Sequence, residues 1–238
     1  MHLVVGLGNP GKKYENNRHN VGFVAVDQLH RSEPTFSDFK EKFSGVYAKS
    51  DDLALLKPMT FMNLSGDSLQ PAAAFLKVEP ANIIVLHDEL DLPFGDVRIK
   101  LGGGHAGHNG LRSIITRLGT PDFIRVRIGV GRPPPDFKGD VADFVLQSFD
   151  PVERAELPAI VDKAVAATRA ILKHGIVAAM GTANVKAKAK PAPTPAAAAT
   201  PAAATPPAPP DPVSPVHPVA VTVAVAVAGL SDPPPKKP

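Results

Sequence analysis

The composition of this 238-residue chain changes abruptly near Lys190, and this change limits what the chain can fold into. Of its 27 prolines, 15 lie in the last 48 residues, mixed with alanine and threonine. Proline removes backbone donors, and alanine offers little side chain to bury. We therefore expect one folded domain over residues 1–188 and a disordered, low-complexity tail over residues 189–238.

Composition also excludes several classes of protein. The chain has no cysteine, so it forms no disulfides and no thiolate metal sites. The apolar stretch over residues 219–230 is too short for a membrane span, which needs about 20 residues, and we interpret it as a β-prone patch or a weak docking segment. No signal-like segment precedes the first strand, so we expect a soluble cytoplasmic protein without a membrane partner. A net charge of +3 does not by itself indicate a nucleic-acid partner.

Strand patterns recur through the first 130 residues. Short apolar runs at residues 3–5 and 82–86 are typical of buried, parallel strands. Residues 46–49 and 53–57, separated by a polar turn, predict a hairpin. Apolar and basic residues alternate over 97–101 and over 124–130, which predicts two strands with one apolar face each.

Helical periodicity separates these strands. Helices are predicted over about 21–31 and 64–77, and over 111–118 with Gly119 just past the end. A longer helix is expected from about Leu157 to Gly175, with Pro158 in its first turn. The combination predicts a single α/β domain with a twisted, mixed β-sheet flanked by helices.

The segment GLGNPG, residues 6–11, follows the first strand and matches the dinucleotide-binding fingerprint Gly-x-Gly-x-x-Gly. That fold needs a helix beginning at the glycines, because the pyrophosphate sits on the helix N-terminus. Here apolar helical spacing begins only at Val21, with Asn20 as an N-cap. The glycines are better interpreted as shaping a loop that brings Asn9, Tyr14 and His19 to the end of the sheet.

Four segments occur in the order VGLGNPGKKYENNRHNVG, PMTFMNLSG, HDELDLPFG and KLGGGHAGHNGL. Together they closely resemble the bacterial peptidyl-tRNA hydrolase family, whose members hydrolyse the ester between a stalled peptide and its tRNA. The resemblance covers about residues 1–188. It implies a monomeric esterase without cofactor, metal or obligate protein partner, which recycles tRNA after premature ribosomal drop-off.

The residues are also suited to ester hydrolysis. Histidine is the natural base near neutral pH, and a carboxylate paired with it fixes its tautomer. His19 lies in a polar loop after one strand, and Asp88 ends the apolar run NIIVLHD, so both side chains are expected at the same edge of the sheet. By resemblance, His19 activates water and Asp88 orients His19.

Three asparagines complete the expected site, because neutral amides can grip hydroxyls, carbonyls and a water. The resemblance implies that Asn9 and Asn63 hold substrate near the ester, with Asn9 counted among the catalytic residues. Asn109 would position the water or the peptide, although its place in the sequence also suits a helix cap. Tyr14 and Phe61 would border the site.

Other chemistries are weakly supported. His105 and His108 form H-x-x-H among glycines, but a zinc hydrolase would need His-Glu-x-x-His on a helix. Ser65 lies outside a Gly-x-Ser-x-Gly elbow, so we expect direct attack by water and no serine nucleophile.

Basic residues gather on the strands and near the catalytic loop. Arg98 and Lys100 share one strand face, as do Arg125 and Arg127, and Lys12, Lys13 and Arg18 lie close to His19 in sequence. The resemblance implies that Arg98, Lys100 and Arg127 clamp the acceptor stem and 3' end of the tRNA. Two alternatives stay open: an RNA-binding protein of this fold that has lost hydrolysis, and a dinucleotide-binding protein.

Overall fold

The structure is a computed structural model that describes residues 1–185. These residues belong to one unit. The expected tail, its apolar stretch at 219–230 and the expected boundary at 188/189 lie outside the described residues and stay predictions. No helix within 1–185 is long and apolar enough to cross a membrane.

The described residues form a mixed sheet of seven strands in the order β2-β3-β4-β1-β5-β7-β6. The central strands β4, β1, β5 and β7 run parallel, while β2, β3 and β6 add antiparallel partners at the two sides. The predicted parallel strands, hairpin and alternating strands are thereby confirmed. The strand bounds are β1 His2–Gly6, β2 Lys40–Lys42, β3 Gly45–Lys49, β4 Leu53–Pro58, β5 Ile83–Glu89, β6 Val97–Leu101 and β7 Ile124–Gly129.

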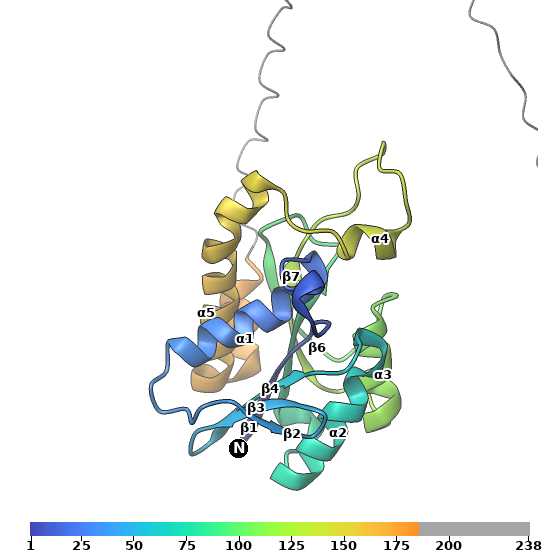
Figure 1. The fold of residues 1–238 in the computed structure, drawn as a ribbon. Coiled ribbons are helices and arrows are strands. Elements are labelled where there is room, and N and C mark those ends of the chain that lie inside the picture. Colours follow the sequence, from blue (N-terminus) through green and yellow to red (C-terminus); the bar gives the residue numbers. More distant parts are fainter. Residues whose placement is uncertain (186–238) are drawn as a thin grey trace, which may run out of the picture. The chain divides into compact units, whose positions relative to one another are not determined.

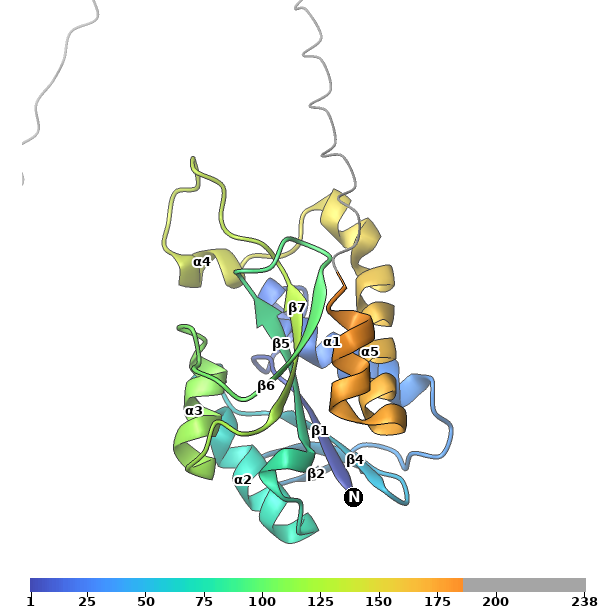
Figure 2. The same cartoon turned by 180° about the vertical axis from the view of Figure 1, so that it is seen from behind.

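Helices cover both faces of the sheet. In Figures 1 and 2, α1 and α5 lie on one side of the strands and α2 and α3 on the other. Their bounds are α1 Val21–Arg31, α2 Ser65–Leu76, α3 Asn109–Leu118, α4 Val141–Val145 and α5 Pro151–Ala183. Short 3-10 turns at η1 Lys12–Tyr14, η2 Arg18–Asn20, η3 Met62–Leu64 and η4 Pro80–Asn82 connect these elements.

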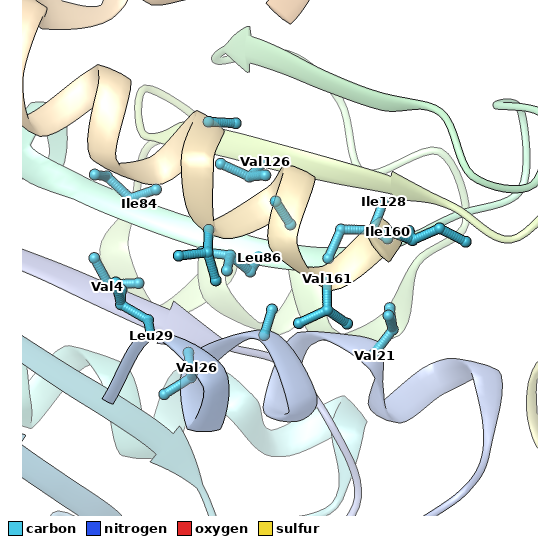
Figure 3. Packing of buried hydrophobic residues seen from close by; sticks show 14 of the residues in the cluster. Val4, Val21, Val26, Leu29, Ile84, Leu86, Val126, Ile128, Ile160 and Val161 are labelled. Carbon is cyan, nitrogen blue, oxygen red and sulfur yellow. The ribbon is translucent and has the colours of Figure 1, made fainter. Parts of the chain in front are cut away.

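Alternation along the strands divides the core into two layers. Val4 and Ile84 pack with α1 and α5, whereas their neighbours Leu3 and Ile83 pack with α2 and α3. Figure 3 shows the first layer, where strand side chains such as Leu86 meet Val26 and Val161 from the two helices. Full burial of each such side chain stabilises the fold by about 1.5–3 kcal/mol, so the central strands are held rigidly.

Three local predictions need correction. The helix expected from Leu157 begins at Pro151, so Pro158 lies in its interior, not its first turn. Apolar periodicity misses this start because residues 151–156 are largely exposed, and the start is set by a capping box of Asp150 and Glu153. The helix also resumes after Gly175, a left-handed kink with φ 76°.

The second and third corrections concern short elements that the sequence analysis missed. The strand β2 is the exposed segment Lys-Glu-Lys and carries no apolar alternation. The five-residue helix α4 is too short for a periodic pattern and begins at a capping box of Asp140 and Asp143. Local periodicity marks only segments that present a face to the core.

Candidate active site

A cleft of about 780 Å³ lies at the carboxyl ends of the parallel strands. Loops that follow β1 and β4 form part of its wall, and β5 reaches into it with its last residues. The helix α4 and the start of α3 line the remaining sides. The cleft brings together seven residues singled out from the sequence: Asn9, Tyr14, His19, Phe61, Asn63, Asp88 and Asn109.

His19 and Asp88 form the centre of the cleft. His19 belongs to the turn η2, directly before α1, and Asp88 is the sixth residue of β5 rather than a residue beyond it. The His19 Nδ1 atom lies 2.8 Å from Asp88 Oδ1 and 2.9 Å from Oδ2. Among residues 1–185 no group hydrogen-bonds His19 Nε2, so this nitrogen is the one available to a substrate or water.

The electrostatics of the pair favour a charged Asp88. Burial alone would raise the pKa of Asp88, but the imidazoles of His19 and His108 hold this pKa well below its usual value. Burial alone would lower the pKa of His19, but the charge of Asp88 and the hydrogen bond to it outweigh burial and raise that pKa. Asp88 therefore makes His19 a stronger base.

His108 is a site residue whose role the sequence analysis missed. Its Nε2 lies 3.0 Å from Asp88 Oδ1, while its Nδ1 accepts from the backbone N–H groups of Gly110 and Leu111. His108, not Asn109, is therefore the N-cap of α3, and Asn109 is the first helical residue. His108 directly precedes the apolar helical spacing of α3, and this position could have identified it as the cap. Histidine is, however, an uncommon N-cap residue.

This arrangement also decides how well the cluster suits a metal ion. Ligand atoms of His19, Asp88 and His108 all lie within 4.8 Å of one another. However, Nδ1 of His108 accepts from two backbone amides, so its proton resides on Nε2 and is donated to Asp88. A protonated nitrogen has no lone pair for a metal, so the donor set fits a hydrogen-bond network better than a metal centre.

His105, the other histidine of the H-x-x-H segment, also lines the cleft. Its Nδ1 accepts from the backbone N–H of Gly107, two residues along the same loop. Buried His87 donates through Nδ1 to the backbone oxygen of Asp88, and burial, assisted by the neighbouring His108, lowers its pKa to about 3. His87 is therefore neutral and supports the end of β5.

The glycine-rich loop after β1 is held by Asn9 and Asn20. Asn20 accepts from the backbone N–H of Asn9 and donates to its carbonyl oxygen, both at 2.9 Å. Asn20 is the N-cap residue of α1, as expected, but its side chain makes no cap hydrogen bond because it is bonded to Asn9. Oδ1 of Asn9 accepts from Met62 N at 2.8 Å, so the amide nitrogen of Asn9 is the end left for other partners.

The first helix after the glycines begins only at Val21, so this loop lacks the helix N-terminus that a pyrophosphate needs. Its glycines serve close packing instead. A Cβ on Gly6 would lie 2.3 Å from the backbone oxygen of Gly22 in α1. The fingerprint therefore lets β1 and α1 approach each other, which sets the position of His19 at the helix start.

Asn63, Asn109, Tyr14 and Phe61 border the open side of the cleft. Asn63 is exposed in the turn η3, Asn109 is exposed as the first residue of α3, and Phe61 is 55% exposed. The Lys13 ammonium lies 4.7 Å from the centre of the Tyr14 ring. These side chains can contact a large substrate without rearrangement of the core.

The four cations of β6 and β7 face one another across the two strands, because Arg98 pairs with Arg127 and Lys100 with Arg125. Arg127 donates to Glu89 at 2.8 Å, and Arg98 donates to Asp96 at 3.0 Å and to the carbonyl of Asn184. Arg125 is buried and donates to the carbonyls of Gly103 and Gly104. Among the described residues, Lys100 has no ion-pair partner.

Comparisons with known proteins identify the family. The family model described as peptidyl-tRNA hydrolase matches residues 3–192. A peptidyl-tRNA hydrolase from Sorangium cellulosum is 59% identical over 192 residues, which cover 79% of this chain and 86% of that protein. One from Mycobacterium tuberculosis (strain ATCC 25177 / H37Ra) is 51% identical over 178 residues, covering 73% of this chain and 92% of that protein.

A solved structure supports the same assignment. The crystal structure of peptidyl-tRNA hydrolase from Acinetobacter baumannii matches with a TM-score of 0.71 and 37% sequence identity, over 78% of this chain and 95% of that chain. The sequence, the sheet and the helices around the cleft thus all match the same group of proteins. The chain belongs to the peptidyl-tRNA hydrolase family.

Proposed function

We propose that this protein hydrolyses the ester bond between peptide and tRNA in peptidyl-tRNA, with His19 as the base that activates water. Membership of the family supports the reaction, and one observation carries the assignment of the base. The His19–Asp88 pair leaves Nε2 without a partner among the described residues while Nδ1 is tied to a charged carboxylate. This is the orientation that a general base needs.

In the proposed reaction His19 Nε2 takes a proton from water as the water oxygen bonds to the ester carbonyl carbon. The negative charge of Asp88 stabilises the imidazolium that forms. The tetrahedral intermediate then collapses, the bond from carbon to the ribose oxygen breaks, and His19 returns the proton to that oxygen. The products are tRNA with a restored hydroxyl group and a peptide carboxylic acid, which releases its proton to solvent and becomes a carboxylate.

Asn9 is the proposed donor to the reacting carbonyl group. Because Met62 N holds its Oδ1, the Asn9 amide nitrogen can serve as a fixed donor beside His19. Fixed donors that meet developing negative charge can each contribute about 10²–10³ in rate. Asn63 and Asn109, exposed on the rim of the cleft, would hold the substrate and position the water.

Lys100 is the proposed principal contact with tRNA phosphates. Arg98 and Arg127 are also expected to contact tRNA, but each already pairs with a carboxylate. Each would bind a phosphate either in place of that carboxylate or together with it. Phosphate contacts of this kind confer affinity without reading the base sequence, which suits an enzyme that accepts many tRNAs.

The test compares wild type with His19→Ala in the release of tRNA from an N-blocked aminoacyl-tRNA, with a chelator present. His105→Ala is the matched control, because His105 lines the same cleft without contacting Asp88. We expect His19→Ala to lower kcat by about 10²–10⁴, with binding largely kept, and the control to stay near wild type.

Ordinary turnover by His19→Ala would refute the assigned base. Tight tRNA binding without hydrolysis by wild type would instead identify a non-hydrolytic RNA-binding protein of this fold. Loss of wild-type activity in the chelator would contradict the metal-free mechanism.

A further inference from the structure

Arg18 directly precedes His19, yet its side chain does not line the cleft and is buried, with 7% of it exposed. Nη2 lies 2.5 Å from Glu153 Oε2, and Nη1 donates to the carbonyl of Ser148 at 3.0 Å. The guanidinium carbon lies 4.3 Å from the centre of the Phe144 ring and 5.5 Å from that of Phe149. The hydrogen bonds, the ion pair and the ring contacts of the Arg18 side chain within residues 1–185 therefore all lie in the segment from α4 to the start of α5.

The backbone joins the same two segments. Arg18 N donates to Gln147 O at 3.0 Å, and Phe149 N donates to Asn16 O at 3.3 Å. Between them Asn17 and Ser148 form an antiparallel bridge. Residues 16–18 and 147–149 thus run side by side, with the Arg18 side chain covering the junction.

The junction follows closely after α4 in the chain, and α4 forms one wall of the cleft. Asp140, Val141, Ala142, Val145 and Leu146 line the cleft from this element. Val141 and Leu146 are 43% and 40% exposed, so this wall presents apolar surface to a substrate. A helix of five residues is not stable by itself, so its position depends on contacts such as that between Phe144 and Arg18.

Glu153 makes the arrangement specific to arginine. Its Oε2 accepts from Arg18 and also from the backbone N–H of Asp150, as part of the capping box of α5. A buried cation needs such partners, because leaving one uncompensated is costly. Lysine cannot donate in two directions from a planar group while stacking on an aromatic ring.

We propose that Arg18 is a positioning residue that fixes the α4 wall relative to His19 and thereby sets the affinity for substrate. The inference rests on the proposed function. His19 itself is held by Asp88 from β5, so loss of the Arg18 contacts moves the wall and leaves the base in place. The expected signature is a change in KM with little change in kcat.

The test uses Arg18→Lys and Glu153→Gln in the full chain. Glutamine keeps the capping box of α5 but removes the charge that pairs with Arg18, so the second variant is informative even where the first folds poorly. We expect kcat/KM to fall by about 10-fold to 10²-fold, carried by KM, as a displaced binding wall would cause. Arg169→Lys is the matched control, because Arg169 pairs with Glu33 in an exposed ion pair outside the cleft lining.

A second readout separates this inference from the proposed function. The affinity for an RNA minihelix carrying a peptide through an amide in place of the ester is measured by fluorescence anisotropy, which requires no hydrolysis. We expect the same fold-change in Kd as in KM. Unchanged Kd and KM in both variants would overturn the role of Arg18, as would a loss confined to kcat.

Failure of wild type to hydrolyse the ester while it binds the amide analogue would count against the proposed function alone. Failure of wild type to bind the analogue would overturn both.

Discussion

Asp88 accepts hydrogen bonds from two imidazoles that differ in what they can do. His108 is fixed as a donor to Asp88 because the amides of α3 occupy its other nitrogen, whereas Nε2 of His19 has no partner among the described residues. The carboxylate thus links the start of α3 to the turn that carries His19 through a single buried group. Its charge controls the basicity of His19, which leads to a prediction about pH.

We expect kcat/KM to rise with pH and to level off above the pKa of His19, because only the neutral imidazole can accept a proton. Since Asp88 raises this pKa above 6.5, the acid limb of the profile lies above pH 6.5. In Asp88→Asn the acid limb of the profile should move to lower pH, because burial lowers the pKa of His19 and no carboxylate opposes it. The plateau value of kcat/KM should fall by about 10² or more. The measurement is kcat/KM from pH 5 to 9.

An acid limb of the wild-type kcat/KM profile below pH 6.5 would contradict this account. An acid limb at the same pH in wild type and in Asp88→Asn would contradict it as well. Circular dichroism of the variant at each pH shows that the fold is intact, since Asp88 is buried.

At the scale of elements, the site depends on how closely α1 approaches the sheet. Gly22 lies in the first turn of α1, three residues after His19. A Cβ at this position would lie 2.4 Å from the backbone oxygen of Leu86 and 2.5 Å from the backbone nitrogen of Leu7. Backbone atoms of two central strand segments cannot move aside, so the helix would have to.

We therefore expect Gly22→Ala to destabilise the protein by about 1–3 kcal/mol, the usual cost of overpacking, and to lower kcat because His19 shifts with the helix start. Thermal unfolding and the hydrolysis assay measure the two effects. Gly181→Ala is the control, because Gly181 is helical and a Cβ there meets nothing within 4 Å. Equal stability and activity in both variants would show that a Cβ at Gly22 can be accommodated between α1 and the sheet, which would contradict this prediction.

At the scale of the whole molecule, one exposed cation of the strand pair β6–β7 has no protein acceptor among the described residues. Arg98, Arg125 and Arg127 are tied to protein acceptors, while Lys100 is exposed and has no ion-pair partner within residues 1–185. The net charge of +3 conceals this local arrangement. Affinity for tRNA should therefore respond to Lys100 more than to the total charge.

We expect Lys100→Glu to weaken tRNA binding and to make the slope of log K against log salt concentration less steep by about 1. The same charge change in Lys173→Glu, on α5 and outside the cleft lining, should leave the slope unchanged. Filter binding at a series of salt concentrations measures both. Equal slopes for the two variants would indicate a general charge effect and remove Lys100 from the interface.

Much of the fold could be predicted from the sequence. Alternation identified the faces of β6 and β7, helical spacing located α1, α2 and α3, and short apolar runs indicated the parallel strands. These patterns are local, because a segment must present apolar residues to the core at its own period. The seven residues that meet in the cleft were also identified, chiefly through the resemblance of four motifs.

The sequence patterns did not show which acceptor each polar side chain meets. Arg18, Arg125 and Lys100 look alike in the sequence, yet the first joins two segments, the second holds a glycine loop and the third is exposed. His108 likewise becomes a hydrogen-bond partner of Asp88 only when α3 packs beside β5. Arg18 and Glu153 are 135 residues apart in the chain. Such pairings depend on three-dimensional packing, because a hydrogen bond is set by the distance between groups and leaves no period in the sequence.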